Sequence, residues 1–423
     1  MAEARPTNPA ELERLRRRTV ATLVAGVALG STGHIAAVAV ATIVATHIAG
    51  GTTIWSGAPS ATVVLGAAAG SIGLSWLMVR RGRRFGLAAG YVVSVLGALV
   101  ATAAVVILSL PLLLIGTVLI GFGNASNQLS RYTAADLAPP DRRASAIGVV
   151  VWGATVGAVA GPNLVAPAGQ IALGLGLPEL SGPYLVPIVF VGAAALLSFL
   201  LLRPDPYELA DASSRHDADG ADRSVAVSLA SVLARPSVPV AMVALVAGQF
   251  VMVLIMTMTP LHMADHGHDL AAVGLVISGH TFGMFGLSPL SGRLTDRFGS
   301  VPVILAGLAV VALASLLAAA APPEGGAILF LALFLLGYGW NLGYVAGSAL
   351  LTHGLSLAER TRIQGLTDGL IWSSAAVASI GSGVVLAYAG FAILGLMGAA
   401  LVVVPVLLVI ARRSAVAGSR GAS

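Results

Sequence analysis

Cysteine and lysine are both absent from this 423-residue chain, and charged residues of every kind make up only 10% of it. Without cysteine the chain has no disulfide and no thiolate metal site, so methionine is the one soft ligand left to it. Without lysine it lacks a phosphate-binding loop of the form G-x4-G-K-[ST], which argues against ATP-driven work. No hydrolytic arrangement of side chains stands out either, so we expect no enzyme activity.

Apolar residues are correspondingly abundant. They make up 57% of the chain, and the mean hydropathy is +0.93. Apolar runs of the roughly 20 residues that cross a bilayer recur along the chain, and in lipid such runs are helices because the backbone must bond to itself. We predict an all-α membrane protein with twelve transmembrane helices in two six-helix halves. The predicted spans are 20–48, 57–79, 85–107, 110–135, 144–166, 184–202, 237–261, 269–290, 301–321, 327–350, 363–386 and 389–411.

The basic residues are distributed as in a membrane protein rather than as in a nucleic-acid-binding protein. The net charge is +5 and all 23 basic residues are arginine. They cluster in the N-terminal tail, in the 80–84 and 142–143 turns, in the central loop and after residue 411. By the positive-inside rule both termini are cytoplasmic. We therefore expect a multi-pass protein of the plasma (inner) membrane, with lipid and a small substrate as its partners, no nucleic acid, and a monomeric state.

A polar stretch rich in Pro, Asp, Ser and Arg divides the chain into an N-terminal half, 1–202, a cytoplasmic linker, 203–236, and a C-terminal half, 237–423. The sequences of the two halves are weakly similar, and matching positions in them are always separated by the same number of residues. Arg80 and Gly82 match Arg297 and Gly299, and Gly148 matches Gly365. Internal repeats of this kind are typical of secondary transporters, whose substrate site lies near the midplane between the repeats.

The repeated loop carries a family resemblance. Residues Gly292 to Gly299, which include Asp296 and Arg297, are similar to the G-x-L-x-D-R-x-G-R motif of the major facilitator superfamily, in the loop after the eighth span. The copy after the second span keeps Arg80 and Gly82, but Val79 replaces the acidic residue. The resemblance implies a twelve-helix secondary active transporter that works by alternating access, in which this loop controls conformation.

A second pattern of that family, G-x8-G-x3-G-P, lies in the fifth span as Gly148, Gly157, Gly161 and Pro162. In the family it is associated with antiporters. Small residues at four-residue spacing are also what close helix packing in lipid requires. The pattern favours antiport and simple packing equally.

Methionine and histidine gather in one part of the second half. Six of the nine methionines and four of the eight histidines lie within residues 242–284: Met242, Met252, Met256, Met258, Met263 and Met284, with His262, His266, His268 and His280. Thioether sulfur selects Cu(I), and imidazole also suits copper. Methionine commonly fills gaps between helices, but a histidine inside a bilayer is costly and typically marks a substrate path or a proton relay.

Two of these pairs have helical spacing. Met252 and Met256 share one face of the seventh span, and His280 and Met284 share one face of the eighth. Met252 and His280 are each fourteen residues from the turn near His266. If the two spans were antiparallel neighbours, these residues would lie at the same depth.

The pattern M-x3-M followed by H-x3-M resembles the CcoA-like branch of the superfamily. The resemblance implies copper import and makes Met252, Met256, His280 and Met284 the metal-binding residues, with copper as cargo and no cofactor. The same branch includes riboflavin transporters. Our leading hypothesis is therefore copper uptake, and the alternative is proton-coupled transport of a small organic molecule, either drug efflux or riboflavin uptake.

The loop between these two spans contains His262, Met263, His266 and His268. It is a candidate outer capture loop that gathers cations before they reach the quartet. A solvated polar turn has the same composition, and the sequence leaves both interpretations open.

Ionisable residues inside the spans are few. Asp136 and Asp368 are the carboxylates predicted within or close to spans; Asp136 follows Arg131 and Asp368 follows Arg362, which favours charge pairing over proton coupling. His34 in the first span is a candidate for coupling or substrate contact, since histidine titrates near physiological pH, and a structural histidine fits this position equally well. Amides and phenols also occupy the fourth and tenth spans: Asn124, Asn127, Gln128, Tyr338, Asn341 and Tyr344.

Overall fold

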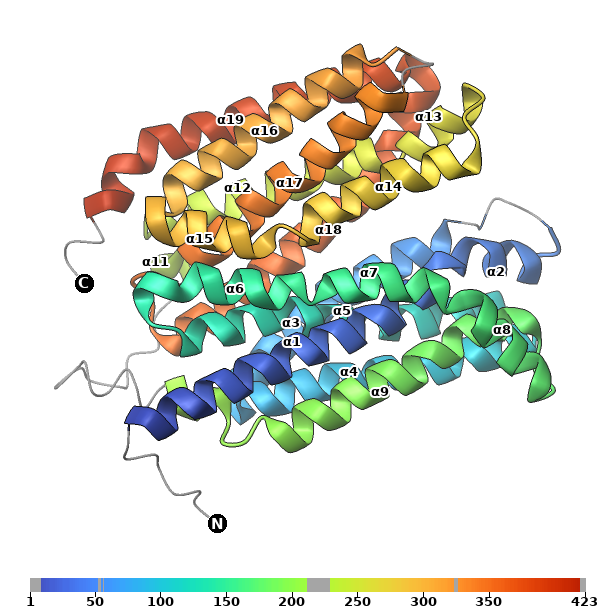
Figure 1. The fold of residues 1–423 in the computed structure, drawn as a ribbon, viewed down its shortest axis with the longest axis horizontal. Helices are drawn as coiled ribbons and strands as arrows, with labels where there is room; N and C mark the ends of the chain where they lie inside the picture. The colour runs from blue at the N-terminus through green and yellow to red at the C-terminus, as the bar shows by residue number, and fades with distance from the viewer. Residues whose placement is uncertain (1–8, 52–54, 56, 211–228, 323–325, 419–423) are drawn as a thin grey trace. The chain divides into compact units, whose positions relative to one another are not determined.

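The computed structural model describes residues 9–51, 55, 57–210, 229–322 and 326–418. Throughout these ranges the regular secondary structure is helical, with no strand. Twelve helical segments are long and apolar enough to cross a membrane. The predicted all-α fold with twelve transmembrane helices is confirmed, and Figure 1 shows its helices.

The chain forms two compact units. The first contains α1 (Pro9–Ala39), α2 (Ala41–Ile48), α3 (Ala58–Arg81), α4 (Arg83–Val106), α5 (Leu110–Leu137), α7 (Ala154–Asn163), α8 (Val165–Gly174), the short 3-10 helix η3 (Glu179–Ser181), α9 (Gly182–Leu201) and residues 364–372. Within it α5 packs on α3 and α4, while α1 packs on α7 and α9. Helix α5 therefore packs on two of the other spans of this unit along much of its length.

The second unit contains η2 (Pro140–Arg142), α6 (Arg143–Trp152), α11 (Leu229–Leu233), α12 (Ser237–Met256), α13 (Thr259–Asp265), α14 (Leu270–Phe285), α15 (Ser288–Phe298), α16 (Ser300–Ala320), α17 (Gly326–Leu350), the rest of α18 (Leu357–Ala389) and α19 (Phe391–Gly418). Helix α17 packs on α12, α14 and α16, and α16 runs beside α19 (Figure 1). Helix α17 is thus the counterpart of α5.

The units differ from the predicted halves in two segments. Residues 140–152 belong to the second unit and residues 364–372 to the first. The two segments overlap in the internal repeat, in which Gly148 matches Gly365. Each half therefore has an equivalent segment that belongs to the other unit. Of the predicted linker, 203–236, residues 211–228 lie outside the described residues.

Proline explains where two spans break. The seventh span ends as α12 at Met256 and resumes as α13, with Pro260 in its first turn. The eighth ends as α14 at Phe285 and resumes as α15, with Pro289 in its first turn. Because proline has no backbone N–H and a fixed φ, it suits the first turn of a helix and interrupts one that is already running.

Two glycines turn the chain in the same way in the two halves. Gly82, between α3 and α4, has a φ of 89°, and Gly299, between α15 and α16, has a φ of 88°. Side chains other than glycine rarely adopt this left-handed conformation. The match between these two positions in the sequence therefore reflects an equivalent sharp turn in each half.

Several helix boundaries differ from the prediction, and one helix is additional. Helix α1 begins at Pro9 rather than near residue 20, because a helix continues into water through charged residues that need no hydrocarbon. Helix α8 is an additional apolar helix of 10 residues. It is too short to cross about 30 Å of lipid.

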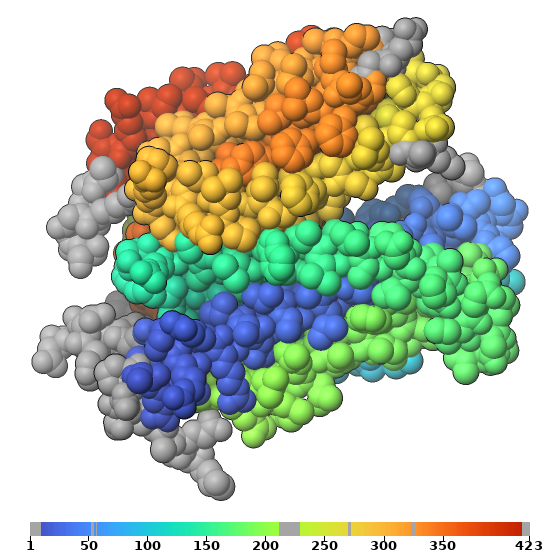
Figure 2. Space-filling view, viewed as in Figure 1, coloured from blue at the N-terminus to red at the C-terminus, as the bar shows by residue number. Residues whose placement is uncertain are grey.

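Large apolar side chains are exposed on the outside of many helices. Leu275 on α14 is 63% exposed and Phe282 is 50% exposed. Figure 2 shows one face of the molecule, on which the side chains of α14 and α15 form part of the surface. Exposed apolar surface of this kind is stable when lipid covers it.

Candidate functional site

His280 lies where α14 packs on α17. Its ring is buried, with 1% of the residue exposed, and Nδ1 is 2.8 Å from the Leu333 carbonyl oxygen. Because a carbonyl only accepts hydrogen bonds, Nδ1 carries a proton, and in the neutral ring Nε2 then carries the lone pair. Nε2 is buried and has no hydrogen-bond partner among the described residues. A ring nitrogen in this state is a ready ligand for a metal ion or acceptor for a substrate.

The other three members of the quartet are on α12 and α14. Met252 is 2% exposed, while Met256 and Met284 are half-buried. Helix α12 packs mainly on α17 and α19, and α14 packs mainly on α17. Helices α12 and α14 therefore share α17 as a neighbour, and α14 approaches the α17 backbone closely where His280 faces Gly337.

The described part of the chain contains no group of three or more histidine or acidic side chains that could hold a metal ion. A metal at the quartet would rest on one imidazole and on thioethers. This set excludes hard cations such as Mg²⁺ and Ca²⁺, which require oxygen ligands.

An aromatic and amide cluster lies on α12, α17 and the end of α14. The Trp340 indole N–H donates to Gln249 Oε1 at 2.8 Å, and its ring stacks on Tyr344 with centroids 4.4 Å apart. Phe285 meets the same indole edge-on at 6.0 Å. Asn341 donates to the Met284 carbonyl oxygen at 2.6 Å. Gln249 was not predicted from the sequence, where its signal was a lone amide in an otherwise apolar span.

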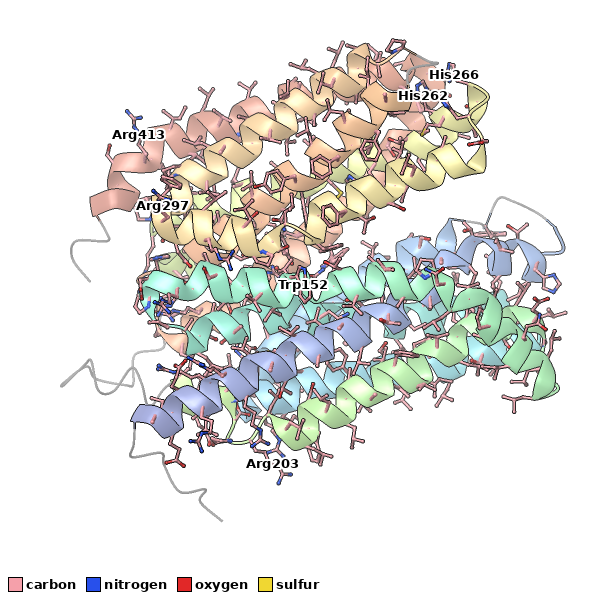
Figure 3. The ribbon with its side chains drawn as sticks, viewed as in Figure 1. Trp152, Arg203, His262, His266, Arg297 and Arg413 are labelled. Carbon is pink, nitrogen blue, oxygen red and sulfur yellow. The ribbon has the colours of Figure 1, made fainter. Side chains whose placement is uncertain are left out.

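The loop histidines are only partly brought together. His262 and His266 lie together at the end of α13 (Figure 3). Their ring centroids are 4.4 Å apart, and His262 stacks on Phe391 at 4.2 Å. Met263 is 1% exposed and points into the protein. His268 lies beside Gly326 at the start of α17. The loop thus presents one histidine pair, held on an aromatic ring.

The second copy of the loop motif fastens two helices together. Both carboxylate oxygens of Asp296 accept hydrogen bonds from the first turn of α6, from the N–H groups of Ala144 at 3.0 Å and Ser145 at 2.9 Å. Gly292 packs against the Ala144 backbone, where a Cβ would meet the carbonyl oxygen at 2.6 Å. A carboxylate at a helix N-terminus satisfies otherwise unbonded N–H groups and the helix dipole. Asp296 therefore anchors α15 to α6.

Asp296→Ala should weaken this anchor by about 0.5–2 kcal/mol, the usual value of an N-terminal cap. Asp296→Asn retains one acceptor oxygen and should lose less than half of that stability. Thermal unfolding of the two purified variants in the same detergent measures the difference. Equal melting temperatures for wild type and Asp296→Ala would show that the contact contributes nothing.

The first copy of the motif works through a different residue. Val79 supplies no carboxylate, and Arg80 lies over the Trp76 ring at 3.7 Å. Arg83, directly after Gly82, is fully buried, and its Nη2 donates to Asp136 Oδ2 at 2.6 Å and to Gln364 Oε1 at 3.0 Å. Arg83 was not predicted from the sequence, although the family motif ends in Gly-Arg and that signal was present.

The start of α4 is held by Asp205. Its carboxylate accepts from the N–H groups of Arg83 at 3.0 Å and Arg84 at 3.1 Å. Burial raises the pKa of the Asp205 carboxyl, an effect that its hydrogen bonds to Tyr207, Arg84 and Arg83 oppose. The turn at Gly82 brings these groups together.

Asp136 and Asp368 both form ion pairs, but with arginines of other helices than their nearest sequence neighbours. Asp136 pairs with Arg83 of α4, and Asp368 pairs with Arg131 of α5, each at 2.6 Å. The predicted links from Asp136 to Arg131 and from Asp368 to Arg362 are replaced by these two pairs, because helical spacing does not reveal which helix lies opposite.

The span-five glycines all lie at close helix crossings. A Cβ on Gly157 would collide with Ser31 of α1, one on Gly161 would approach Ile35 of the same helix at 2.9 Å, and one on Gly148 would collide with the Ser288 carbonyl of α15. Pro162 lies inside α7, close to its end. Packing therefore accounts for the glycines, and the antiport association stays a prediction.

His34 is on α1, and its Nδ1 is buried without a hydrogen-bond partner among the described residues. Three residues before it, Ser31 accepts from Asn127, which in turn accepts from the Tyr91 hydroxyl at 2.9 Å. These polar groups from α1, α4 and α5 form a small network in the first unit. A role for His34 in coupling stays a prediction.

Twelve apolar helices with an internal repeat, glycine-lined crossings and buried charge pairs define a multi-pass membrane transporter rather than an enzyme. The family model of the Major Facilitator Superfamily matches the sequence twice, over residues 19–273 and 240–422. The chain belongs to the Major Facilitator Superfamily, and it acts on a small substrate in a membrane. The double match agrees with the internal repeat.

Similar proteins support this assignment. The MFS-type transporter YdeG of Bacillus subtilis, which is uncharacterized, is 36% identical over 403 residues, covering 95% of this chain and 94% of YdeG. The riboflavin transporter RfnT of Brucella anthropi is 30% identical over 352 residues, covering 81% of this chain and 84% of RfnT. The structure of the MFS transporter FucP in the outward conformation superposes with a TM-score of 0.74 at 17% identity, covering 93% of this chain and 98% of FucP, which shows the shared fold.

Proposed function

We propose that this protein takes up copper by secondary active transport, with Met252, Met256, His280 and Met284 as the residues that hold the ion. The observation that carries the proposal is the state of His280. Its Nδ1–H donates a hydrogen bond to the Leu333 carbonyl oxygen, and its Nε2 is buried without a hydrogen-bond partner among the described residues. A buried acceptor left unbonded is costly, and binding a cation removes that cost.

The ligand chemistry selects the cargo. As ligands, three thioethers and one imidazole would make a soft, neutral set, and soft sulfur ligands favour Cu(I) over Mg²⁺, Ca²⁺ and Mn²⁺. A neutral set also releases its ion more readily than a thiolate set does, and a transporter must release what it binds. The absence of cysteine from the sequence fits this requirement.

The proposed direction of transport is supported by the residues at the two ends of the second unit. His262 and His266 lie at one end, while Arg297 and Arg413 lie at the other (Figure 3). The positive-inside rule puts the arginine end in the cytoplasm. We propose that the protein lies in the plasma (inner) membrane with cytoplasmic termini, functions as a monomer, and admits copper at the histidine end by alternating access of its two repeats.

Copper uptake into proteoliposomes tests the proposal. With Cu(I) kept reduced and accumulation measured by mass spectrometry, wild type should show saturable uptake. Met252→Leu, Met284→Leu and His280→Asn should each lower uptake at limiting copper by at least about 10-fold, because each removes a ligand. Leucine preserves the packing of methionine, so the variants should fold.

Met397→Leu on α19 is the matched control, since Met397 lies outside the cluster, and it should transport like wild type. Unchanged uptake by both Met252→Leu and His280→Asn would refute the site. Absence of saturable copper uptake by wild type would refute the cargo.

A second candidate cargo is a small organic molecule. It would be either riboflavin, which is taken up, or a drug, which is exported. It is favoured by the relative named as a riboflavin transporter and by the Trp340 and Tyr344 stack next to Gln249. A planar ring can insert between or stack on such aromatic faces. If this cargo is correct, the chain should rescue a riboflavin auxotroph on low riboflavin, and Trp340→Ala should abolish the rescue.

A further inference from the structure

Asp368 is held by the most complete ion pair in the described part of the first unit. Arg131 donates to both of its carboxylate oxygens, from Nη1 to Oδ2 at 3.1 Å and from Nη2 to Oδ1 at 2.6 Å. The Tyr132 hydroxyl adds a third hydrogen bond to Oδ1 at 3.2 Å. The two charged side chains are only 1% and 2% exposed. Both charges have therefore been removed almost completely from solvent.

Among the hydrogen-bond partners of Asp368 in the described residues, Arg131 is the charged one. From α5 the groups that face Asp368 are Arg131 and Tyr132. Helix α3 meets the same segment of α18 through uncharged atoms, with Ser75 against Gly365 and Ile72 against Gly369.

The nearest further charges lie toward the start of α18. Arg83 of α4 bonds to Gln364, and Glu359, Arg360 and Arg362 precede that residue in the helix. Among the described residues, the charge of the Asp368 carboxylate is thus balanced by one guanidinium in direct contact.

The internal repeat shows that the scaffold does not need this pair. The shift that carries Gly148 onto Gly365 also carries Val151 of α6 onto Asp368, and Arg131 onto Ser348 of α17. Helices α6 and α17 pack together in the second unit, and Val151 and Ser348 are both buried. The equivalent helix crossing therefore contains Val151 and Ser348 in the second unit, whereas it contains Asp368 and Arg131 in the first.

A buried ion pair adds little stability over well-packed uncharged residues, because desolvation offsets the attraction. The pair at Arg131 and Asp368 is thus retained for a property that uncharged residues lack. A carboxylate can bind a proton, and inside a membrane such groups mark proton pathways.

We infer that Asp368 is the residue that binds the coupling proton in the transport cycle, with Arg131 as its counter-ion in the deprotonated state. This rests on the proposed secondary transport and names the coupling ion for it. When the carboxylate takes up a proton, it becomes neutral and its ion pair to Arg131 is lost. Residues 364–372 are then less tightly held against α5. Loss of the proton restores the pair, so proton binding and the conformation of α18 are linked reciprocally.

The first test does not depend on the cargo. Infrared difference spectra of the full-length protein in phosphatidylethanolamine and phosphatidylglycerol vesicles report protonation of buried carboxyl groups as pH is lowered. Wild type should show a carbonyl band of a protonated acid, and Asp368→Asn should lose it. Asp136→Asn, which alters the other buried carboxylate, should keep it. A titrating band that persists unchanged in Asp368→Asn would overturn the inference.

The second test separates coupling from binding. With copper as the probe, Asp368→Asn should exchange internal for external copper within about twofold of wild type. The same variant should lose at least about fivefold of the accumulation driven by an imposed pH gradient. Full gradient-driven accumulation in this variant would overturn the inference.

A double variant controls for the chance that Asp368→Asn fails to fold. Arg131→Ser with Asp368→Val installs the uncharged residues that the second unit uses at the same crossing. It should fold, exchange copper, and fail to respond to the pH gradient. Retention of the pH response would refute the role of Asp368. If wild type moves no copper at all, the proposed cargo fails, whereas the infrared titration still decides the proton site.

Discussion

Arg83→Met should destabilise the protein by about 3–5 kcal/mol, the cost of removing one partner from a buried ion pair. Arg83 is fully buried and donates to both Asp136 and Gln364. Without the guanidinium, the Asp136 carboxylate loses the cation that offsets its burial. We expect a large fall in folded yield and in apparent melting temperature, measured on detergent-purified protein.

The double variant Arg83→Met with Asp136→Leu should recover most of the lost stability, because it removes both charges rather than one. Arg80→Met is the matched control. Arg80 lies on the same turn but is exposed over the Trp76 ring, so its loss should change stability little. A stable Arg83→Met variant would show that the Gly-Arg end of the first motif has no structural role.

Gly148→Val and Gly365→Val should each abolish transport and lower stability by about 1–3 kcal/mol or more through overpacking. The two positions match in the internal repeat and make equivalent contacts. A Cβ on Gly148 would collide with the Ser288 carbonyl of α15, and one on Gly365 would collide with Ser75 and approach the Ser71 carbonyl of α3 at 2.6 Å. Because these neighbours include backbone atoms, the crossing cannot open without moving a helix.

Gly381→Val is the matched control on α18, since a Cβ there meets nothing within 4 Å among the described residues. It should fold and transport normally. Size-exclusion profiles and copper uptake of the three variants measure the effect. Normal transport by Gly148→Val would show that close packing is not why the span-five glycine is needed.

The candidate site shows where prediction from sequence succeeds and where it stops. The i and i+4 spacing places His280 and Met284 on one helix face, because helical periodicity is a local property. The hydrogen bond from His280 to Leu333, which fixes its tautomer, joins residues 53 positions apart. No local pattern predicts such a contact. The same limit explains why Gln249 was missed and why Asp136 was linked to Arg131 rather than to Arg83.

By itself the sequence determined that the protein lies in a membrane, the number of membrane spans and the internal repeat. Those properties follow from composition and periodicity, since lipid forces each apolar run to bond to itself as a helix. Tertiary structure alone decided which helices meet: the exchange of residues 140–152 and 364–372 between the units, the placement of α12 and α14 against α17, and the partners of Arg83 and Arg131. Without a hydrophobic driving force between helices in lipid, these choices depend on close packing at small residues and on buried polar pairs. Both are contacts between residues far apart in the chain, and they exist only once the helices have assembled.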